Sequence, residues 1–343
     1  MPGAWTHVLG ADEISNNIKD VKYKNIIEEN NKIYQYGAQG PDIFLYYCIF
    51  IPSKHKRVEK LGQRIHTDKT REFIMYFIDK IKETKTKEDF ECLLSYTLGF
   101  VTHYALDATM HPFIYYFGGI YHPDMEDTKK YDFYHRELEN IIGMLELEDI
   151  RGKNESKGNI HNEIDIGKKV PRVLEETYSS ALYEIYNLRI KNYLLQYCYK
   201  DMKSGFKFLM DTNLGKNILL SLLEIIINKK NKSKITLNPE KIIHEYDYLN
   251  KKHIQWNHPC NLEEKSNKGA EELYKEGVKK GSEMVEAIIN YLEDKIDRIE
   301  LEKLIPNISY ESGKPLDEYK KMIYFDCIFE KDKVEMHPKG KNK

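Results

Sequence analysis

Apolar residues recur at intervals of three and four over most of this 343-residue chain, which is the spacing of one face of an α-helix. Polar stretches at residues 151–163 and 228–241 interrupt the pattern and predict loops. No run alternates apolar and polar residues as a half-buried strand does, and no repeat of fixed period occurs. We therefore predict an all-α fold, with helices over residues 11–36, 69–82, 87–110, 132–147, 170–199, 204–227 and 263–299.

The pattern weakens at the C-terminal end and at one internal proline. We expect residues 1–304 to form a single multi-helix domain and residues 305–343 to form a less regular extension with a disordered end. Pro112 should end or kink the helix that begins at Lys87, because the residue before a proline avoids the α-helical region. His111 would then point in a different direction from the residues one turn before it.

Composition narrows the class of protein and its compartment. The 53 Lys and Arg residues nearly balance the 55 Asp and Glu residues, so no overall charge points to nucleic acid. The start MPGAWTHVLGADEI lacks the basic and apolar regions of a signal peptide, and no stretch approaches the roughly 18 apolar residues of a membrane span. We expect a cytoplasmic protein. Its five cysteines are scattered without a CxxC pair, which predicts reduced cysteines that pack in the interior.

Candidate chemistry is concentrated in the segment HYALDATMH, in which His103, Asp107 and His111 follow one another at intervals of four. Each such step rotates a helical side chain by only about 40°, so the three groups share one face. His135 and Glu139 repeat the spacing. A single histidine on an apolar helix is usually a core histidine bonded to a carbonyl. Asp107, however, follows an apolar run without a nearby Lys or Arg, and a buried carboxylate needs a cation. The segment therefore favours a metal such as zinc.

Three more candidate ligands precede this segment: His7 in the sequence WTH, Asp42 in GPD and His66 in RIH. With the HxxxD at residues 103–107 and the HxxxE at residues 135–139, their order resembles the zinc-dependent phospholipase C family, which shares an all-helical fold with S1/P1-type nucleases. The resemblance covers roughly the first 140 residues and the helical character of the rest.

The resemblance implies a cleft that holds two or three zinc ions. One ion would be held by His66, His103 and Asp107, with Asp42 beside it, and a second by His111, His135 and Glu139. His7 would belong to a third site, bridged by Asp107.

Two departures from the family pattern concern these sites. Secreted members place a histidine six residues after the HxxxD aspartate, whereas His111 comes four residues after Asp107, so His122 is a rival for its role. Secreted members also bind metal through a processed N-terminal Trp. The nearest Trp here is Trp5, which MPGA precedes, so the third site is expected to be altered or weak.

The ligand types indicate a reaction. Zinc lowers the pKa of bound water from 15.7 to about 7, and paired metals suit displacement at phosphorus. The predicted substrate is a phosphodiester, with phospholipid as one candidate, and Asp42 is the predicted catalytic residue that orients or deprotonates the attacking water. Tyr104, Tyr115, Tyr116 and Tyr121 either contact the substrate or pack in the core.

Two other functions remain open at this stage. A single-strand nuclease of the S1/P1 type would use the same cleft and bind nucleic acid through an aromatic slot. A non-catalytic binding protein would keep the ligands for metal-dependent folding alone. A basic run at residues 229–234 either contacts anionic lipid at a membrane surface or forms a solvated loop. The segment WNHPC is predicted to be a loop that packs Trp256 against the core, and His244, Glu245 and Asp247 lack the same-face spacing of a ligand set.

Overall fold

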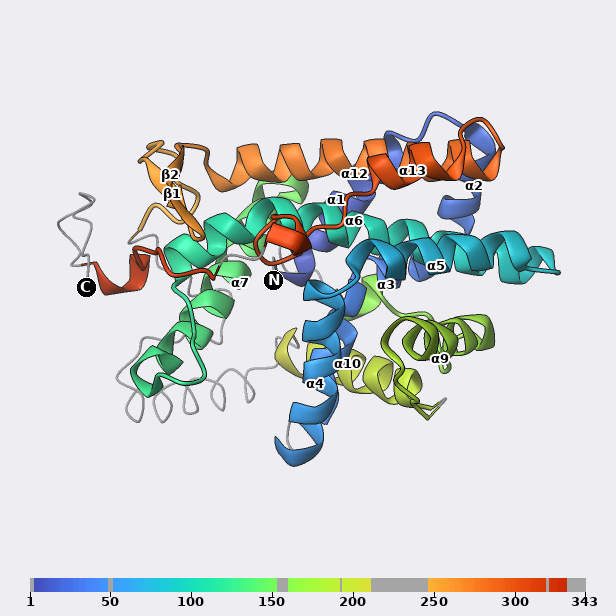
Figure 1. Cartoon of the computed structure of the whole chain (residues 1–343), viewed down its shortest axis with the longest axis horizontal. Helices are drawn as coiled ribbons and strands as arrows, with labels where there is room; N and C mark the ends of the chain where they lie inside the picture. Colours follow the sequence, from blue (N-terminus) through green and yellow to red (C-terminus); the bar gives the residue numbers. More distant parts are fainter. Residues whose placement is uncertain are drawn as a thin grey trace.

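The computed structural model describes residues 3–48, 52–152, 160–191, 193–210, 246–318 and 321–331. Its regular structure is almost entirely helical, with one small hairpin (Figure 1), so the prediction of an all-α fold is confirmed. The α-helices are α1 (Ala4–Asn16), α2 (Val21–Glu29), α3 (Asn31–Gly37), α4 (Pro52–Thr67), α5 (Thr70–Glu83), α6 (Lys87–Gly118), α7 (Lys129–Arg151), α8 (Ile160–Glu163), α9 (Arg172–Tyr186), α10 (Leu194–Met210), α12 (Ala270–Leu292) and α13 (Arg298–Leu304). The short 3-10 helices are η1 (Gly40–Tyr46), η2 (Glu126–Thr128), η4 (Leu316–Glu318) and η5 (Ile328–Glu330).

Helix α6 is the centre of the fold. It is 32 residues long, and its residues from Cys92 onward are almost all buried, as expected for a helix that is apolar on every side. Figure 1 shows α12 running alongside it, and α3, α5 and α7 also pack against it. The helix begins at Thr86, whose side chain accepts a hydrogen bond from the Asp89 amide. Groups on α6 after Cys92 are therefore held in a densely packed and mostly buried environment.

Helices α3 and α6 approach so closely that their backbones touch. A Cβ atom added to Gly99 on α6 would lie only 2.1 Å from the Tyr34 carbonyl oxygen on α3. Only glycine allows this approach. This close approach places the end of α3 and the following residue, Ala38, against the segment of α6 that includes His103.

The predicted end of α6 was wrong. Pro112 lies inside the helix, which continues to Gly118. Dense packing around α6 outweighs the loss of one backbone hydrogen bond at a proline. His111 consequently stays on the helical face that also carries His103 and Asp107.

Two other predicted helices are divided. Residues 11–36 form parts of α1, α2 and α3, because Asn17 follows the end of α1 and Asp20 caps α2 through the Lys22 amide. The helix predicted over residues 170–199 breaks at Asn187, which has a φ of 53° in the left-handed region, and α10 then runs without interruption from Leu194 to Met210. Asparagines mark all three breaks, since Asn17, Asn30 and Asn187 follow the ends of α1, α2 and α9, and the apolar spacing gives no sign of them.

The expected absence of strands was also wrong in one place. Strands β1 (Trp256–His258) and β2 (Asn261–Ser266) pair antiparallel, so residues 263–266 are strand and not the start of the predicted helix. Strand β2 has no buried residue, which explains why its sequence shows no apolar alternation. Trp256 does pack against the core as predicted, with its ring against Phe113 of α6, but its segment was wrongly predicted to be a loop, since it forms β1.

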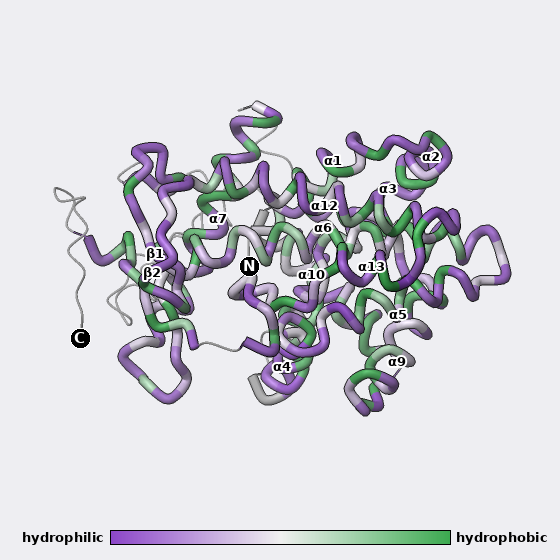
Figure 2. Tube along the Cα trace, turned by 45° about the horizontal axis from the view of Figure 1, so that its top comes forward, coloured by the Kyte–Doolittle hydropathy of each residue, from purple (hydrophilic) through white to green (hydrophobic). Residues whose placement is uncertain are grey.

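After Leu304 the described chain contains only short 3-10 turns, and the division at residue 304 stays a prediction. Several predicted features lie outside the described residues: the later part of the helix over 204–227, the loop at 228–241 with its basic run, His244, Glu245 and the last residues of the tail. None of the five cysteines, all within the described residues, forms a disulfide bond. Apolar and polar residues interleave along the helices (Figure 2), and none of the described helices combines the length and apolar character needed to cross a bilayer.

Candidate metal centre

His103, Asp107 and His111 lie in a buried row along one face of α6, with Asp107 in the middle. Its Oδ2 atom lies 3.1 Å from Nε2 of His103 and 3.7 Å from Nδ1 of His111. The intervals of four residues therefore place imidazole, carboxylate and imidazole on one face, as the sequence predicted. Asp107 has no exposed side-chain surface, and no Lys or Arg among the described residues forms an ion pair with it.

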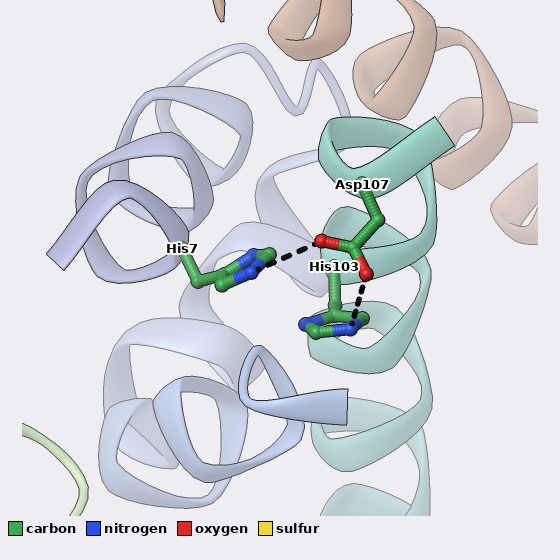
Figure 3. A group of neighbouring side chains, drawn as sticks. All are labelled: His7, His103 and Asp107. Carbon is green, nitrogen blue, oxygen red and sulfur yellow. Dashed lines mark ion pairs between the residues drawn. The ribbon is translucent and has the colours of Figure 1, made fainter. Parts of the chain in front are cut away.

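Helix α1 brings His7 to this row. His7 Nε2 lies 3.3 Å from Oδ1 of Asp107, and the His7 ring stacks on the His103 ring with 4.1 Å between centroids. Figure 3 shows the two imidazoles next to each other, each directed at a different oxygen of the Asp107 carboxylate. His7, His103 and Asp107 are close enough to hold one metal ion.

A second group forms where η1 and the last turn of α4 meet α6. Asp42 Oδ1 lies 3.2 Å from His66 Nε2 and 3.7 Å from His103 Nε2. His66 Nε2 is also 3.6 Å from Oδ2 of Asp107. Asp42, His66 and His103 can therefore hold an ion directly beside the first group.

The third group joins α6 to α7. Glu139 Oε1 lies 2.8 Å from Nε2 of His135 and 3.7 Å from Nε2 of His111. His111, His135 and Glu139 are likewise close enough to one another to hold one metal ion. All eight predicted ligand residues thus lie in three adjoining groups, and Asp107 contacts members of each group.

Backbone carbonyls orient three of the histidines. Nδ1 of His66 donates to the Gly62 carbonyl, Nδ1 of His103 to the Ala38 carbonyl and Nδ1 of His111 to the Tyr310 carbonyl, at 2.8, 3.2 and 2.8 Å. A donating Nδ1 leaves the lone pair on Nε2, and this nitrogen faces the carboxylates in each case. The three rings are therefore set in the tautomer that binds metal through Nε2.

Burial leaves many of these polar atoms without a hydrogen bond among the described residues. The set comprises both ring nitrogens of His7, Oδ1 of Asp42, Nε2 of His66, His103 and His111, and both carboxylate oxygens of Asp107. Orphaned buried polar atoms cost about 1–3 kcal/mol each, and more when charged. Their nitrogen and carboxylate donors are those that zinc accepts. The residues therefore fit a divalent metal such as zinc, which would satisfy atoms that no other described residue satisfies.

The protonation of these groups also suits a metal. Burial lowers the pKa of His7, His111 and His135, which keeps these imidazoles neutral. Burial alone would raise the pKa of Asp107, but electrostatic interaction with His103 and His111 and hydrogen bonds to His103 and His7 outweigh it and hold this pKa well below its usual value. Burial likewise lowers the pKa of His66, but the neighbouring Asp42 outweighs it and leaves the pKa raised. Neutral imidazoles and an ionised carboxylate are the forms that bind metal.

A sequence model of the family described as zinc-dependent phospholipase C matches residues 6–184. This chain belongs to that family. The phospholipase C match covers just over half of the chain and includes all eight candidate ligands, from His7 to Glu139. Comparisons with curated proteins and with solved structures found no match.

The structure also locates the other residues that the sequence singled out near the candidate metal ligands. His122, the rival of His111, is outside the three groups. Trp5 stands in the first turn of α1 with its indole buried. Tyr115 lies beside the third group, with its ring 4.4 Å from that of His135, while Tyr116 packs on Phe117 and Trp256. Tyr121 is partly exposed, and Tyr104 packs on Tyr310.

Sequence reasoning missed Tyr310 altogether. Its carbonyl orients His111 and its ring lies 5.2 Å from the ring of His66, yet it lies in the segment expected to be a peripheral extension. No motif or spacing in the sequence marks it, since its contribution to His111 comes from the backbone.

Proposed function

We propose that this protein hydrolyses phosphodiesters with zinc bound at the three ligand groups, in the manner of a phospholipase C. The proposal depends on one observation, which is the continuous buried arrangement of Asp107 and the seven other candidate ligands. A metal needed only for folding is served by one closed set of four ligands, whereas adjoining groups suit a reaction at phosphorus. Zinc, when bound, supplies an activated water at neutral pH and neutralises charge on the phosphate.

The contacts of His103 limit how many ions are tightly held. Its Nδ1 is engaged by the Ala38 carbonyl, so only Nε2 is left as a ligand, yet His103 belongs to both the first and the second group. One nitrogen serves one ion. We assign it to the ion of Asp42 and His66, because Asp42 is partly exposed to an incoming substrate whereas His7 and Asp107 are completely buried. This assignment leaves His7 and Asp107 as a weaker, two-residue site. The proposal is two tightly bound zinc ions and a third that binds more weakly.

Exposure indicates the side from which a substrate enters. The side chains of His135, Asp42 and Glu139 are 12%, 10% and 8% exposed, whereas those of His7, His103 and Asp107 are completely buried. A phosphodiester would therefore meet Asp42 on one side and the His135 and Glu139 pair on the other. The His7 site would lie behind them.

Asp42 is the proposed catalytic residue. It is the more accessible of the two aspartates, it stands on η1 and not on a long helix, and Oδ1 has no hydrogen bond among the described residues. A carboxylate so placed orients the attacking water and accepts its proton. Phospholipid is the proposed natural substrate. The reaction would therefore take place at a membrane surface.

The test is turnover of a panel of phosphodiesters by the zinc-loaded protein, with phosphatidylcholine vesicles, a soluble aryl phosphodiester and single-stranded DNA. We expect hydrolysis of the lipid, and about 10²–10⁴-fold lower turnover in Asp42→Asn, which is the usual worth of a positioned acid–base group. The exposed Asp124→Asn serves as the control.

Three outcomes contradict different parts of the proposal. Preference for DNA would favour the nuclease. Absence of turnover on every diester, with zinc bound, would favour the non-catalytic binding protein. Full activity of Asp42→Asn would remove Asp42 from the mechanism and leave the substrate assignment intact.

A further inference from the structure

Residues 305–316 form a turn that we call the C-terminal clasp, and it lies outside the part of the chain that matches the family. Three separate elements anchor it. The Thr70 hydroxyl at the start of α5 donates to the Ile308 carbonyl at 2.8 Å, and the Tyr104 hydroxyl of α6 donates to the Pro306 carbonyl. Nε2 of His258, on the hairpin, donates to the Ser312 carbonyl at 3.0 Å. The clasp therefore ties α5, α6 and the hairpin together.

The backbone of Tyr310, inside the clasp, links two ligand residues. Its N–H donates to the His66 carbonyl at 2.9 Å, in the last turn of α4. Its carbonyl accepts from Nδ1 of His111 at 2.8 Å. One residue thus touches a ligand of the second group and a ligand of the third. The bond to His111 also sets the tautomer that leaves Nε2 of His111 free to face Glu139.

The Tyr310 side chain supports the same arrangement by packing. It is completely buried, with ring centroids 5.2 Å from His66 and 4.7 Å from Tyr104. Its hydroxyl has no hydrogen-bond partner among the described residues. The ring therefore acts as a wall that keeps the His66 imidazole in place, and the hydroxyl contributes nothing to that contact.

The clasp docks on α6 at the irregularity that Pro112 creates. A proline at position 112 cannot donate to the carbonyl four residues before it, which is that of Ala108. Gly313, with a φ of +63°, sits directly on this carbonyl, and a Cβ atom added to Gly313 would lie 2.4 Å from the Ala108 oxygen. Only glycine fits at this point. The position of Tyr310 thus depends on Pro112 and Gly313, which are 201 residues apart in the sequence.

We propose that Tyr310 is a positioning residue of the metal centre, and that docking of the clasp on α6 holds His66 and His111 in their metal-binding orientations. The site is incomplete without this segment, although the segment supplies no ligand from the three groups. The inference rests on the metal-binding part of the proposed function and is independent of the reaction.

Thermodynamic linkage makes the proposal reciprocal. If a docked clasp raises zinc affinity by some factor, bound zinc must stabilise the docked clasp by the same factor. Partners that orient metal ligands are usually worth about 10–100-fold in metal affinity. We therefore expect undocking of the clasp to weaken zinc binding by about tenfold or more, and zinc to protect the Tyr310 amide from hydrogen exchange to a similar degree.

The first experiment compares Gly313→Ala with Gly167→Ala in the full chain. Both glycines have positive φ, +63° and +97°, so both variants carry the backbone strain of an L residue, but a Cβ on Gly167 meets nothing within 4 Å. Zinc affinity is measured by competition with a chelating dye of known affinity. We expect Gly313→Ala to bind at least one zinc about tenfold more weakly than Gly167→Ala. Equal affinities in two folded variants would overturn the proposal.

Two further measurements keep the test decisive if Gly313→Ala does not fold. Hydrogen exchange of the unaltered protein with and without zinc should show added protection at Tyr310 and none in the Gly167 turn, and unchanged exchange at Tyr310 would overturn the proposal. Tyr310→Phe should bind zinc as the parent does, because the backbone and the ring carry the effect. A parent protein that binds no zinc would be a separate result, since it would remove the metal centre itself.

Discussion

Asp107 is the carboxylate at the middle of the candidate metal centre, and it lies close to members of all three ligand groups. Its two oxygens face different groups, with Oδ1 3.3 Å from His7 of the first group and Oδ2 3.6 Å from His66 of the second. With zinc bound as proposed, a carboxylate placed in this way would neutralise charge on two ions at once. It is also fully buried, so its negative charge needs those ions or protonated histidines for compensation.

Asp107→Asn is therefore expected to lower zinc content and stability together. The amide nearly preserves the shape of the side chain but removes the charge and one of the two equivalent oxygens. We expect at least about tenfold weaker zinc binding, and a smaller rise of the melting temperature on zinc addition, because binding to the folded state alone stabilises it by mass action. Zinc analysis after dialysis and melting curves with and without zinc measure both effects.

Glu146→Gln provides the comparison for Asp107→Asn. Glu146 is a buried carboxyl on α7 that lies outside the three ligand groups. It should keep the parental zinc content. An Asp107→Asn variant that melts and binds zinc like the parent would show that Asp107 is an ordinary buried helix residue.

The candidate ligands were accessible from the sequence because each belongs to a short motif whose spacing has a direct geometric meaning. His103 and Asp107 share a helical face by their separation of four, and the order of WTH, GPD, RIH, HxxxD and HxxxE added the rest. Tyr310 could not be found in this way. Its contribution is a backbone amide, a backbone carbonyl and a packed ring, and none of these has a sequence signature.

At the scale of elements, the contact between α3 and α6 links core packing to the metal centre. Gly99 sits where the two backbones touch, and a Cβ atom there would be 2.1 Å from the Tyr34 oxygen and 2.9 Å from the Ala38 nitrogen. Ala38 also supplies the carbonyl that orients His103. Separation of these helices would therefore disturb stability and a candidate metal ligand together.

Gly99→Ala should lower the free energy of unfolding by about 1–3 kcal/mol, as overpacking of a well-packed core usually does, even though alanine is the better helix former. Gly205→Ala on α10 is the matched control, because its added Cβ would meet only Tyr46 at an ordinary 3.8 Å. That change should be neutral or stabilising. Urea unfolding of the metal-free proteins measures both. Equal effects at the two glycines would show that the helices can separate without cost.

The errors in element prediction have a common cause. The apolar spacing identified where helices pack, but it did not locate their ends. Asn187 ends α9 through a left-handed conformation, with the Leu188 amide bonded to the Leu182 carbonyl, and these are local contacts within an otherwise continuous apolar pattern. Pro112 is the opposite case, in which the surrounding core sustains a helix that local preference would end.

At the scale of the whole molecule, one buried carboxyl sets a slope of stability with pH. Burial raises the pKa of Glu146 to about 8 from the ordinary 4.5, against a lowering effect of the Thr6 hydroxyl, which donates to it at 2.6 Å. Between these two pH values the folded protein holds a proton that the unfolded chain has lost. The contribution of Glu146 to the free energy of unfolding of the metal-free protein therefore falls as pH rises through this window.

Glu146→Gln should remove this slope, because the amide stays neutral and its oxygen can still accept from Thr6. The variant should match the parent near pH 4.5 and exceed it at pH 8, by as much as several kcal/mol at about 1.4 kcal/mol per pKa unit. Urea midpoints at pH 4.5, 6 and 8 in the presence of a chelator test this. The exposed Glu283→Gln on α12 should follow the parent at every pH. A parallel loss with pH in both Glu146→Gln and the parent would assign the slope to other groups.

The position of Tyr310 in the chain has a consequence for how the protein is made. Translation delivers the N-terminal end first, so all eight candidate ligands, from His7 to Glu139, leave the ribosome before the residue that orients His111. During that interval the histidines are present, but the imidazole of His111 has no carbonyl from Tyr310 to hold it. Tight capture of zinc would then be among the last events of biosynthesis, which keeps a half-made chain from trapping metal in a misfolded state.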